Sequence, residues 1–255
     1  MSAMTHLSLF SGIGGLDLAA EWAGFVTVGQ CEVAEFQTKV LEKHWEDVPR
    51  WRDIRTLTKE SFYERTGLET VTVISGGFPC QPHSKAGRRK ASADERDLWH
   101  EMRRVISELR PKWVVAENVR GILSSEDGRY FRGVLRDFSD LGYDVGWGCL
   151  RAADVGAVHR RERMGIIAYS RGGRHLDSHD EKCRVERREQ ALDDPYSSVE
   201  SWQEQCNIFE PKLLRDSDGV PDWVDRIKSL GNAVVPQQFF PFFDTIARIE
   251  GGSDG

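Results

Sequence analysis

The sequence has few cysteines and no long hydrophobic run. Its five cysteines, among 255 residues, are scattered and include no CxxC pair, which argues against a disulfide framework and against a four-cysteine zinc site. Apolar stretches such as VVAENV are far shorter than the roughly 20 residues of a membrane-spanning helix. The N-terminus MSAMTHLSLF has no charged segment before an apolar one. We therefore expect a cytoplasmic protein with no membrane partner.

An overall excess of positive charge is also missing. The net charge is −6, which by itself argues against a nucleic-acid partner. Basic residues nevertheless gather in two segments: residues 80–104 carry 7 Lys/Arg against 4 Asp/Glu, and residues 151–190 carry 10 against 7. These segments are either solvated surface or parts of a cleft that contacts phosphates.

Short apolar or β-branched runs alternate with segments of helical spacing. We expect strands near 5–10, 25–31, 71–75, 112–117, 143–148 and 164–169, with a further short strand before Asp53. Helices are expected over 16–24, 97–110 and 129–142, with Gly24 and Gly142 at helix-ending positions. This rhythm predicts an α/β fold with a doubly wound, mostly parallel sheet, whose ligands bind at the carboxyl ends of the strands.

The alternation fails after Ser170. The polar and charged stretch that follows is typical of a long loop or a small appended module. Regular structure returns with AVVPQQFFPFFDTIARI, which predicts a helix that packs on the first domain despite its internal Pro241. We therefore expect one domain made of residues 1–169 and 229–255 and a separate short region at 170–228.

Glycines and carboxylates follow the first two expected strands. The first strand runs into FSGIGG at 10–15, where glycines allow a ligand to approach the backbone and the helix N-terminus. The motif predicts either a nucleotide-like cofactor site or a structural tight turn, since its spacing is not that of a dinucleotide motif. Glu32, at the end of the second strand, suits ribose hydroxyls, and Asp53 offers a second polar contact.

Reactive side chains follow the later strands. Cys80 lies in GGFPCQ before a basic loop, where positive charge favours the thiolate, whereas we expect Cys31 and Cys149 to be buried and inert. Glu117 ends the fifth strand and is either a helix or strand cap or a proton donor to a heterocycle. Arg161 and Arg163 share one side of a strand by two-residue alternation and could address a carbonyl or a phosphate.

In this order, the motifs resemble those of the cytosine-5 DNA methyltransferase family. The match runs FSGIGG, Glu32, Asp53, FPCQ, ENV, the R-x-R of Arg161 and Arg163, and GNAVVP at 231–236, and it spans nearly the whole chain. Two positions depart from the family pattern, because Val158 and His159 stand where Pro and Gln are usual. No R-x-L-x-x-x-E segment precedes GNAVVP, which is similar to compact phage-like or prophage-like members.

The resemblance implies the Rossmann-like fold of S-adenosylmethionine-dependent methyltransferases with a short target-recognition region. It implies methyl transfer from S-adenosylmethionine to carbon 5 of a cytosine flipped out of double-stranded DNA. Cys80 would attack carbon 6, Glu117 would hold the ring N3 and the exocyclic amine, and Arg163 would hold the ring oxygen. The implied catalytic residues are Cys80, Glu117, Arg161 and Arg163. The implied cofactor residues are Phe10, Ser11, Gly12, Gly14, Gly15, Glu32, Asp53, Phe78, Asn232 and Val234. The implied DNA-binding residues are Gln81, Ser84, Arg88, Arg89 and Lys90.

Two other functions stay open at this point: a tRNA cytosine-5 methyltransferase, which shares the catalytic residues, and a non-catalytic DNA-binding relative. We expect a monomer that binds double-stranded DNA in the cytoplasm of a bacterial or phage-infected host cell, and the resemblance is compatible with a separately acting cognate restriction endonuclease. No metal is expected, because a solvated loop explains His175, His179, Cys183 and Cys206 better than a zinc site does.

Overall fold

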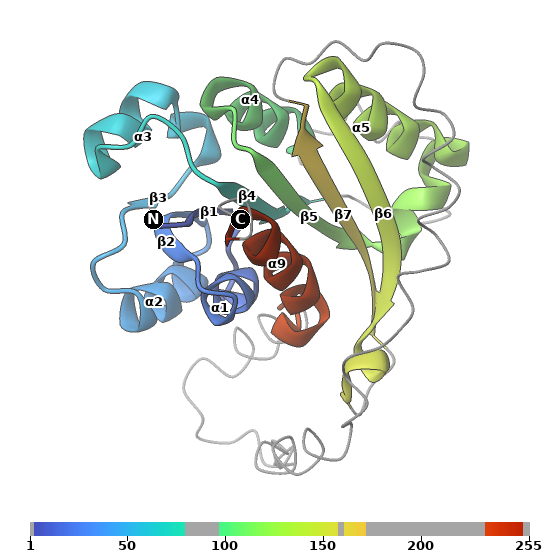
Figure 1. Ribbon diagram of the computed structural model, residues 1–255, viewed down its shortest axis with the longest axis horizontal. Helices are drawn as coiled ribbons and strands as arrows, with labels where there is room; N and C mark the ends of the chain where they lie inside the picture. Colours follow the sequence, from blue (N-terminus) through green and yellow to red (C-terminus); the bar gives the residue numbers. More distant parts are fainter. Residues whose placement is uncertain (1–2, 80–96, 158–160, 172–232, 252–255) are drawn as a thin grey trace.

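The described residues of this computed structural model are 3–79, 97–157, 161–171 and 233–251. Their strands are β1 (Thr5–Leu9), β2 (Val26–Cys31), β3 (Arg50–Trp51), β4 (Val73–Gly77), β5 (Trp113–Val119), β6 (Tyr143–Arg151) and β7 (Glu162–Ser170). Within the described ranges these form one seven-stranded sheet in the order β3-β2-β1-β4-β5-β7-β6 (Figure 1). The first five strands pair in parallel, and β7 runs antiparallel between β5 and β6.

Helices cover both faces of this sheet. The α-helices are α1 (Gly15–Trp22), α2 (Glu35–His44), α3 (Lys59–Thr66), α4 (Trp99–Leu109), α5 (Arg129–Asp140) and α9 (Pro236–Gly251), and the 3-10 turns are η1 (Ile54–Thr56), η3 (Arg120–Gly128) and η4 (Ala152–Val155). Figure 1 shows α3, α4 and α5 on one side of the sheet and α1, α2 and α9 on the other. The result is a three-layer α/β/α arrangement.

The central strands are apolar on both faces because each face packs against helices. On β5, Val114 belongs to the core under α4 and α5, and its neighbour Val115 belongs to the core under α1 and α9. Successive strand residues point to opposite faces. A continuous apolar run therefore supplies core side chains on both faces of the sheet. α9 is bound to the sheet by Phe239, Phe243 and Ile246, none of which is exposed to solvent.

A buried polar chain joins the first helix to the central strands. The Asp17 carboxylate of α1 accepts hydrogen bonds from the Ser8 hydroxyl at 2.8 Å and from the Gln30 amide at 2.8 Å. Arg50 of β3 donates to the Gln30 side-chain oxygen at 2.9 Å. Burial raises the pKa of Asp17 to about 6, although the bonds from Gln30 and Ser8 oppose the rise. This chain fixes the start of α1, and with it the glycine turn.

The structure confirms the predicted α/β fold and mostly parallel sheet, including the short strand before Asp53 and the helix that contains Pro241. Gly24 and Gly142 adopt positive φ angles of 86° and 85° after their helices, as expected. α2 and α3 were not predicted because they bury very little: Thr38 and Leu41 in α2, and Phe62 in α3.

The prediction for the cysteines is half wrong. Cys31 is buried, and burial raises the pKa of its thiol to about 12. Cys149, however, is exposed. It lies on β6, which among the described strands is the last of the sheet and has a neighbour on one side only. The side chains of β6 are therefore covered less completely than those of the central strands.

The proposed division into domains stays a prediction. β7 ends at Ser170, and α9 begins at Pro236 and packs against α1, but nearly all of 170–228 lies outside the described residues. Within the described ranges, no helix is long and apolar enough to cross a membrane.

Candidate active site

The polar motifs of the sequence meet at one edge of the sheet. Leu9 of β1 is in register with Cys31 of β2 and with Gly76 of β4, and Gly77 is in register with Glu117 of β5. Because these strands are parallel, the residues that follow them emerge at the same edge. The glycine turn, Glu32 and Glu117 therefore lie along a single line of strand ends.

The turn after β1 has an unusual backbone. Phe10, Gly12 and Gly14 adopt positive φ angles of 52°, 56° and 89°. A non-glycine residue in this region is uncommon and is often found at functional sites. The Ser11 amide donates to the Cys31 carbonyl at 3.0 Å, and the Gly14 amide donates to the Ser11 carbonyl at 2.9 Å. These bonds hold the turn against the end of β2.

At two positions of the turn, neighbouring atoms leave no room for a side chain, so glycine is required. A Cβ at Gly14 would lie 2.4 Å from the Trp45 ring, and one at Gly15 would lie 2.5 Å from the Val234 carbonyl oxygen. At Gly12 a Cβ would meet no atom of the described residues within 4 Å. The turn is therefore packed from behind by Trp45 and by the segment before α9, and it is open at Gly12.

Glu32 ties the turn to the end of β2. Its carboxylate accepts the Gly12 amide at 2.8 Å and the Ala34 amide at 2.8 Å. Burial raises the pKa of Glu32, and the backbone hydrogen bonds oppose the rise. Each carboxylate oxygen has a further lone pair, so the group can still accept hydrogen bonds from ligand hydroxyls.

Asp53 lies nearby, just beyond β3. Its carboxylate accepts the Arg55 amide at 2.9 Å and caps the turn η1, and 46% of its side chain is exposed. Cys31, at the end of β2, is in register with Trp51 of β3, and the Glu32 amide donates to the Trp51 carbonyl at 3.0 Å. The ends of β2 and β3, which Glu32 and Asp53 follow, therefore lie side by side. Glu32 thus borders the open side of the turn, and Asp53 follows the neighbouring strand end.

The Phe78 side chain has a different setting. Only 2% of the residue is exposed, and its ring centroid lies 5.0 Å from that of Trp99. Its carbonyl accepts the Asn118 side-chain amide at 2.9 Å, and the Asn118 side-chain oxygen accepts the Val119 amide at 2.9 Å. Sequence reasoning did not single out Asn118, although it stands in the ENV motif. It links the end of β5 to the chain that runs from β4 toward Cys80.

Glu117 is a largely buried carboxyl, with 12% of its side chain exposed, and it has arginine partners. Its Oε1 lies 2.8 Å from Nε of Arg163 on β7. Burial raises the pKa of Glu117, and the charges of Arg163 and Arg161 oppose the rise. The pKa of Arg161 is lowered, first by burial, then by Arg163. The structure therefore pairs Arg163 with Glu117, and the charge of Arg161 also acts on this carboxyl.

Gly77 makes room for this carboxyl. A Cβ added at Gly77 would lie 2.8 Å from Oε2 of Glu117, which is closer than real Cβ contacts come. No local sequence signal indicates this contact, because it follows from the pairing of β4 with β5.

Several predicted site residues lie outside the described residues: Cys80, Gln81, Ser84, Arg88, Arg89, Lys90, Val158, His159 and Asn232. The same holds for His175, His179, Cys183 and Cys206. Among the described residues, no group of three or more His, Cys, Asp or Glu side chains could hold a metal ion.

The fold is that of the S-adenosylmethionine-dependent methyltransferase class. A crystal structure from E. coli, described as a DNA modification methyltransferase encoded within a prophage, is similar with a TM-score of 0.56 and 27% identity, covering 66% of this chain and 47% of that one. The family model for C-5 cytosine-specific DNA methylases matches residues 4–212. The chain belongs to that family, which confirms the resemblance drawn from the sequence.

Type II methyltransferases are among the similar proteins. M.Sau96I of Staphylococcus aureus is 34% identical over 165 residues, which is 62% of this chain and 37% of that protein. M.FnuDI of Fusobacterium nucleatum is 35% identical over 167 residues, which is 65% of this chain and 47% of that protein. The match thus covers less than half of the length of each of these relatives.

Proposed function

We propose that this chain is a DNA (cytosine-5-)-methyltransferase that transfers a methyl group from S-adenosylmethionine to carbon 5 of cytosine in a specific double-stranded sequence. The observation that carries the proposal is the largely buried Glu117 carboxyl, which has an ion pair to Arg163 and a raised pKa at the strand ends. Membership of the cytosine-5 family supplies the reaction that this carboxyl would serve.

Covalent catalysis by Cys80 is the central step of the proposal. Carbon 5 of an intact pyrimidine is a poor nucleophile. Addition of the Cys80 thiolate to carbon 6 turns the ring into an enamine-like form whose carbon 5 can take the methyl group. Loss of the carbon-5 proton then drives elimination, which restores the aromatic ring and frees Cys80.

Glu117 would assist the addition by protonating the ring. A carboxyl whose pKa is raised holds a proton closer to neutral pH than a solvated one, so it can donate to the ring N3 as carbon 6 is attacked. Its other oxygen can accept from the exocyclic amine. Arg163 holds the Glu117 carboxyl in place and offers further N–H groups to the ring oxygen, with Arg161 beside it.

The residues at the glycine turn fit an adenosine-containing cofactor. Among the described residues the backbone is open at Gly12, and the Glu32 carboxylate stands beside it as an acceptor for ribose hydroxyls. Asp53, which follows the neighbouring strand β3, offers an acceptor for the adenine. S-adenosylmethionine supplies an electrophilic methyl group when bound. The remaining residues proposed for this site are Phe10, Ser11, Gly14, Gly15, Phe78, Asn232 and Val234. Of these, Gly14, Gly15 and Phe78 shape the site through the packing described above.

Double-stranded DNA is the proposed substrate, with the target base flipped out because neither face of a stacked ring is accessible. Residues 170–228 would recognise the target sequence, and Gln81, Ser84, Arg88, Arg89 and Lys90 would contact DNA. A monomer suffices, because one chain supplies both the glycine turn and Glu117. The relatives named Type II methyltransferases support a separately acting cognate restriction endonuclease as a partner.

Methyl transfer from radiolabelled S-adenosylmethionine tests the proposal. The purified chain and its Cys80→Ser variant are each incubated with bacterial genomic DNA or with bulk tRNA, and the digested nucleosides are separated. We expect labelled 5-methyldeoxycytidine from DNA with the wild type and none with Cys80→Ser. Label in tRNA alone would contradict the DNA assignment in favour of the RNA reaction. Cofactor binding without transfer to either acceptor would favour a non-catalytic relative.

A further inference from the structure

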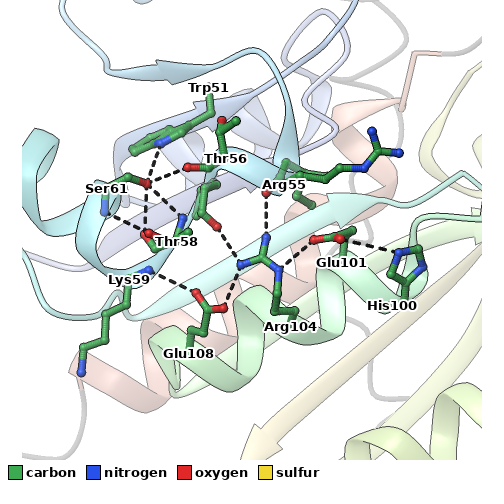
Figure 2. A network of polar contacts seen from close by, with 12 residues as sticks. Trp51, Arg55, Thr56, Thr58, Lys59, Ser61, His100, Glu101, Arg104 and Glu108 are labelled. Carbon is green, nitrogen blue, oxygen red and sulfur yellow. Dashed lines mark hydrogen bonds and ion pairs between the residues drawn. The ribbon is translucent and has the colours of Figure 1, made fainter.

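Arg104 of α4 binds the turn that carries Asp53. Its Nη2 donates to the Ile54 carbonyl at 2.8 Å, and its Nη1 donates to the Leu57 carbonyl at 3.0 Å. These two carbonyls belong to η1 and to the residue that ends it. Figure 2 shows the guanidinium between α4 and this turn. One side chain therefore holds both ends of the turn, from 47 and 50 residues away in sequence.

Two carboxylates of the same helix fix the direction of the guanidinium. Nε of Arg104 donates to Glu101 at 2.8 Å, and Nη1 donates to Glu108 at 2.8 Å (Figure 2). Glu108 also accepts the Lys59 amide at the start of α3 at 3.1 Å. Burial alone would lower the pKa of Arg104, but the hydrogen bonds to Glu108 and Glu101 outweigh this effect, and the pKa is raised. The planar, charged fork is thus pre-oriented toward the two carbonyls.

The sheet itself holds this turn weakly. β3 is only two residues long and is the last strand on its side of the sheet. Asp53 follows it, and its own carboxylate bonds are to Arg55 within the turn. The buried side chains of Ile54 and Leu57 anchor the turn by packing, but packing alone does not fix the direction of a carboxylate. The Arg104 fork supplies directional bonds on both sides of η1.

We infer that Arg104 is a positioning residue that sets Asp53 to recognise the amino group of adenine. The inference rests on the proposed function, in which Asp53 contacts the adenine of the cofactor. A carboxylate accepts a hydrogen bond from the 6-amino group of adenine and repels the 6-oxygen of hypoxanthine. A shift of the η1 turn weakens this discrimination, whereas contacts made by Glu32 to the ribose are the same for both bases.

Calorimetric titration with S-adenosylhomocysteine and with S-inosylhomocysteine tests this inference, because both probes are stable and differ only at the base. The ratio of their affinities is compared between the wild type, Arg104→Lys and the control Arg103→Lys. Lysine keeps a positive charge beside Glu101 and Glu108 but cannot offer a fork to two carbonyls. Arg103 is adjacent on α4 and forms its ion pair with Asp137 of α5 at 3.2 Å, away from the turn.

We expect the wild type to prefer the adenosine compound by about tenfold or more, since a hydrogen bond to a charged group is worth that much. Arg104→Lys should reduce the preference about fivefold, and Arg103→Lys should leave it unchanged. In an Asp53→Ala background, which offers no polar group to the base, the Arg104 substitution should have no further effect on the ratio. A loss of stability alone would lower both affinities together and would not change their ratio.

Three results would count against the inference. An unchanged ratio in Arg104→Lys, beside a wild type that binds and discriminates, would overturn the role of Arg104 and leave the proposed function intact. If Arg103→Lys lowers the affinity ratio as much as Arg104→Lys does, the effect comes from a general disturbance of α4 and not from the Arg104 fork. No binding of either compound by the folded wild type would overturn the proposed function, and the inference with it. If Arg104→Lys does not fold, Glu108→Gln takes its place, and a reduced preference is again the supporting result.

Discussion

The close approach of Gly77 to Glu117 predicts that Gly77→Ala lowers methyl transfer without unfolding the chain. The added Cβ would lie 2.8 Å from Oε2 of Glu117, whereas ordinary contacts begin at 3.4 Å. The carboxylate must therefore move by about 0.6 Å, and its bond to Arg163 must lengthen or rotate. Misplacement of a catalytic group by about 1 Å can cost about 100-fold in rate. We expect kcat to fall by about 10- to 100-fold.

The stability of Gly77→Ala separates this effect from unfolding. The φ angle of Gly77 is not in the left-handed region, so alanine is compatible with the backbone, and the overlap involves the end of a side chain. Gly133→Ala is the matched control, because a Cβ there meets no other described residue within 4 Å and the residue lies within α5. The control should keep kcat and gain about 0.5 to 1 kcal/mol of stability. A folded Gly77→Ala variant with the kcat of the wild type would refute the reasoning.

Three further predictions concern the same part of the molecule. Glu117→Gln should lower kcat by about 100-fold or more in the methyl-transfer assay, because an amide cannot deliver the proton; a loss under tenfold would contradict the proton-donor role. Asp17 has a folded-state pKa of about 6, raised from 3.8, so its contribution to stability is full below 3.8 and is lost as pH rises through 6. In urea unfolding, the free energy of unfolding of the wild type should therefore fall by about 3 kcal/mol relative to that of Asp17→Asn, mostly between pH 4 and 7. Parallel pH profiles of the two proteins would contradict the raised pKa of Asp17. Gly15→Ala should lower the free energy of unfolding by about 1 to 3 kcal/mol, because the added Cβ overlaps the backbone carbonyl of Val234. A variant with the urea midpoint of the wild type would contradict this prediction and would show that the segment before α9 moves aside without loss of stability.

The position of this site at the strand ends could be predicted from the sequence, because each motif directly follows a predicted strand. Phe10, Glu32 and Glu117 could be placed in this way, and parallel pairing then brings them to one edge. The insertion of β7 between β5 and β6 was not predicted, since antiparallel order depends on contacts between distant segments. The ion pair of Arg163 with Glu117 was therefore not predicted. The family resemblance implied only that both residues contact the same base, and two-residue alternation placed Arg161 and Arg163 on one side of a strand.

Contacts between distant segments had no local signal. Trp45 packs on Gly14 from 31 positions later in the numbering, and Arg104 holds the turn after Asp53 from another helix. Cys149 was expected to be buried because cysteines usually are, but its place on the last strand of the sheet leaves it exposed. In each case the missing information was which elements are neighbours, and periodicity along the chain does not contain it.

Single-base methylation mapping tests the central claim most directly. DNA from cells that express the wild type, and from cells that express Cys80→Ser, is sequenced after bisulfite conversion, with equal amounts of soluble protein verified. The account predicts a short motif whose cytosine is protected from conversion only with the wild type, and the motif would identify the target of residues 170–228. Protection that persists with Cys80→Ser would contradict covalent catalysis by Cys80. No protected cytosine in either sample, from a wild type that binds S-adenosylmethionine, would contradict DNA as the substrate.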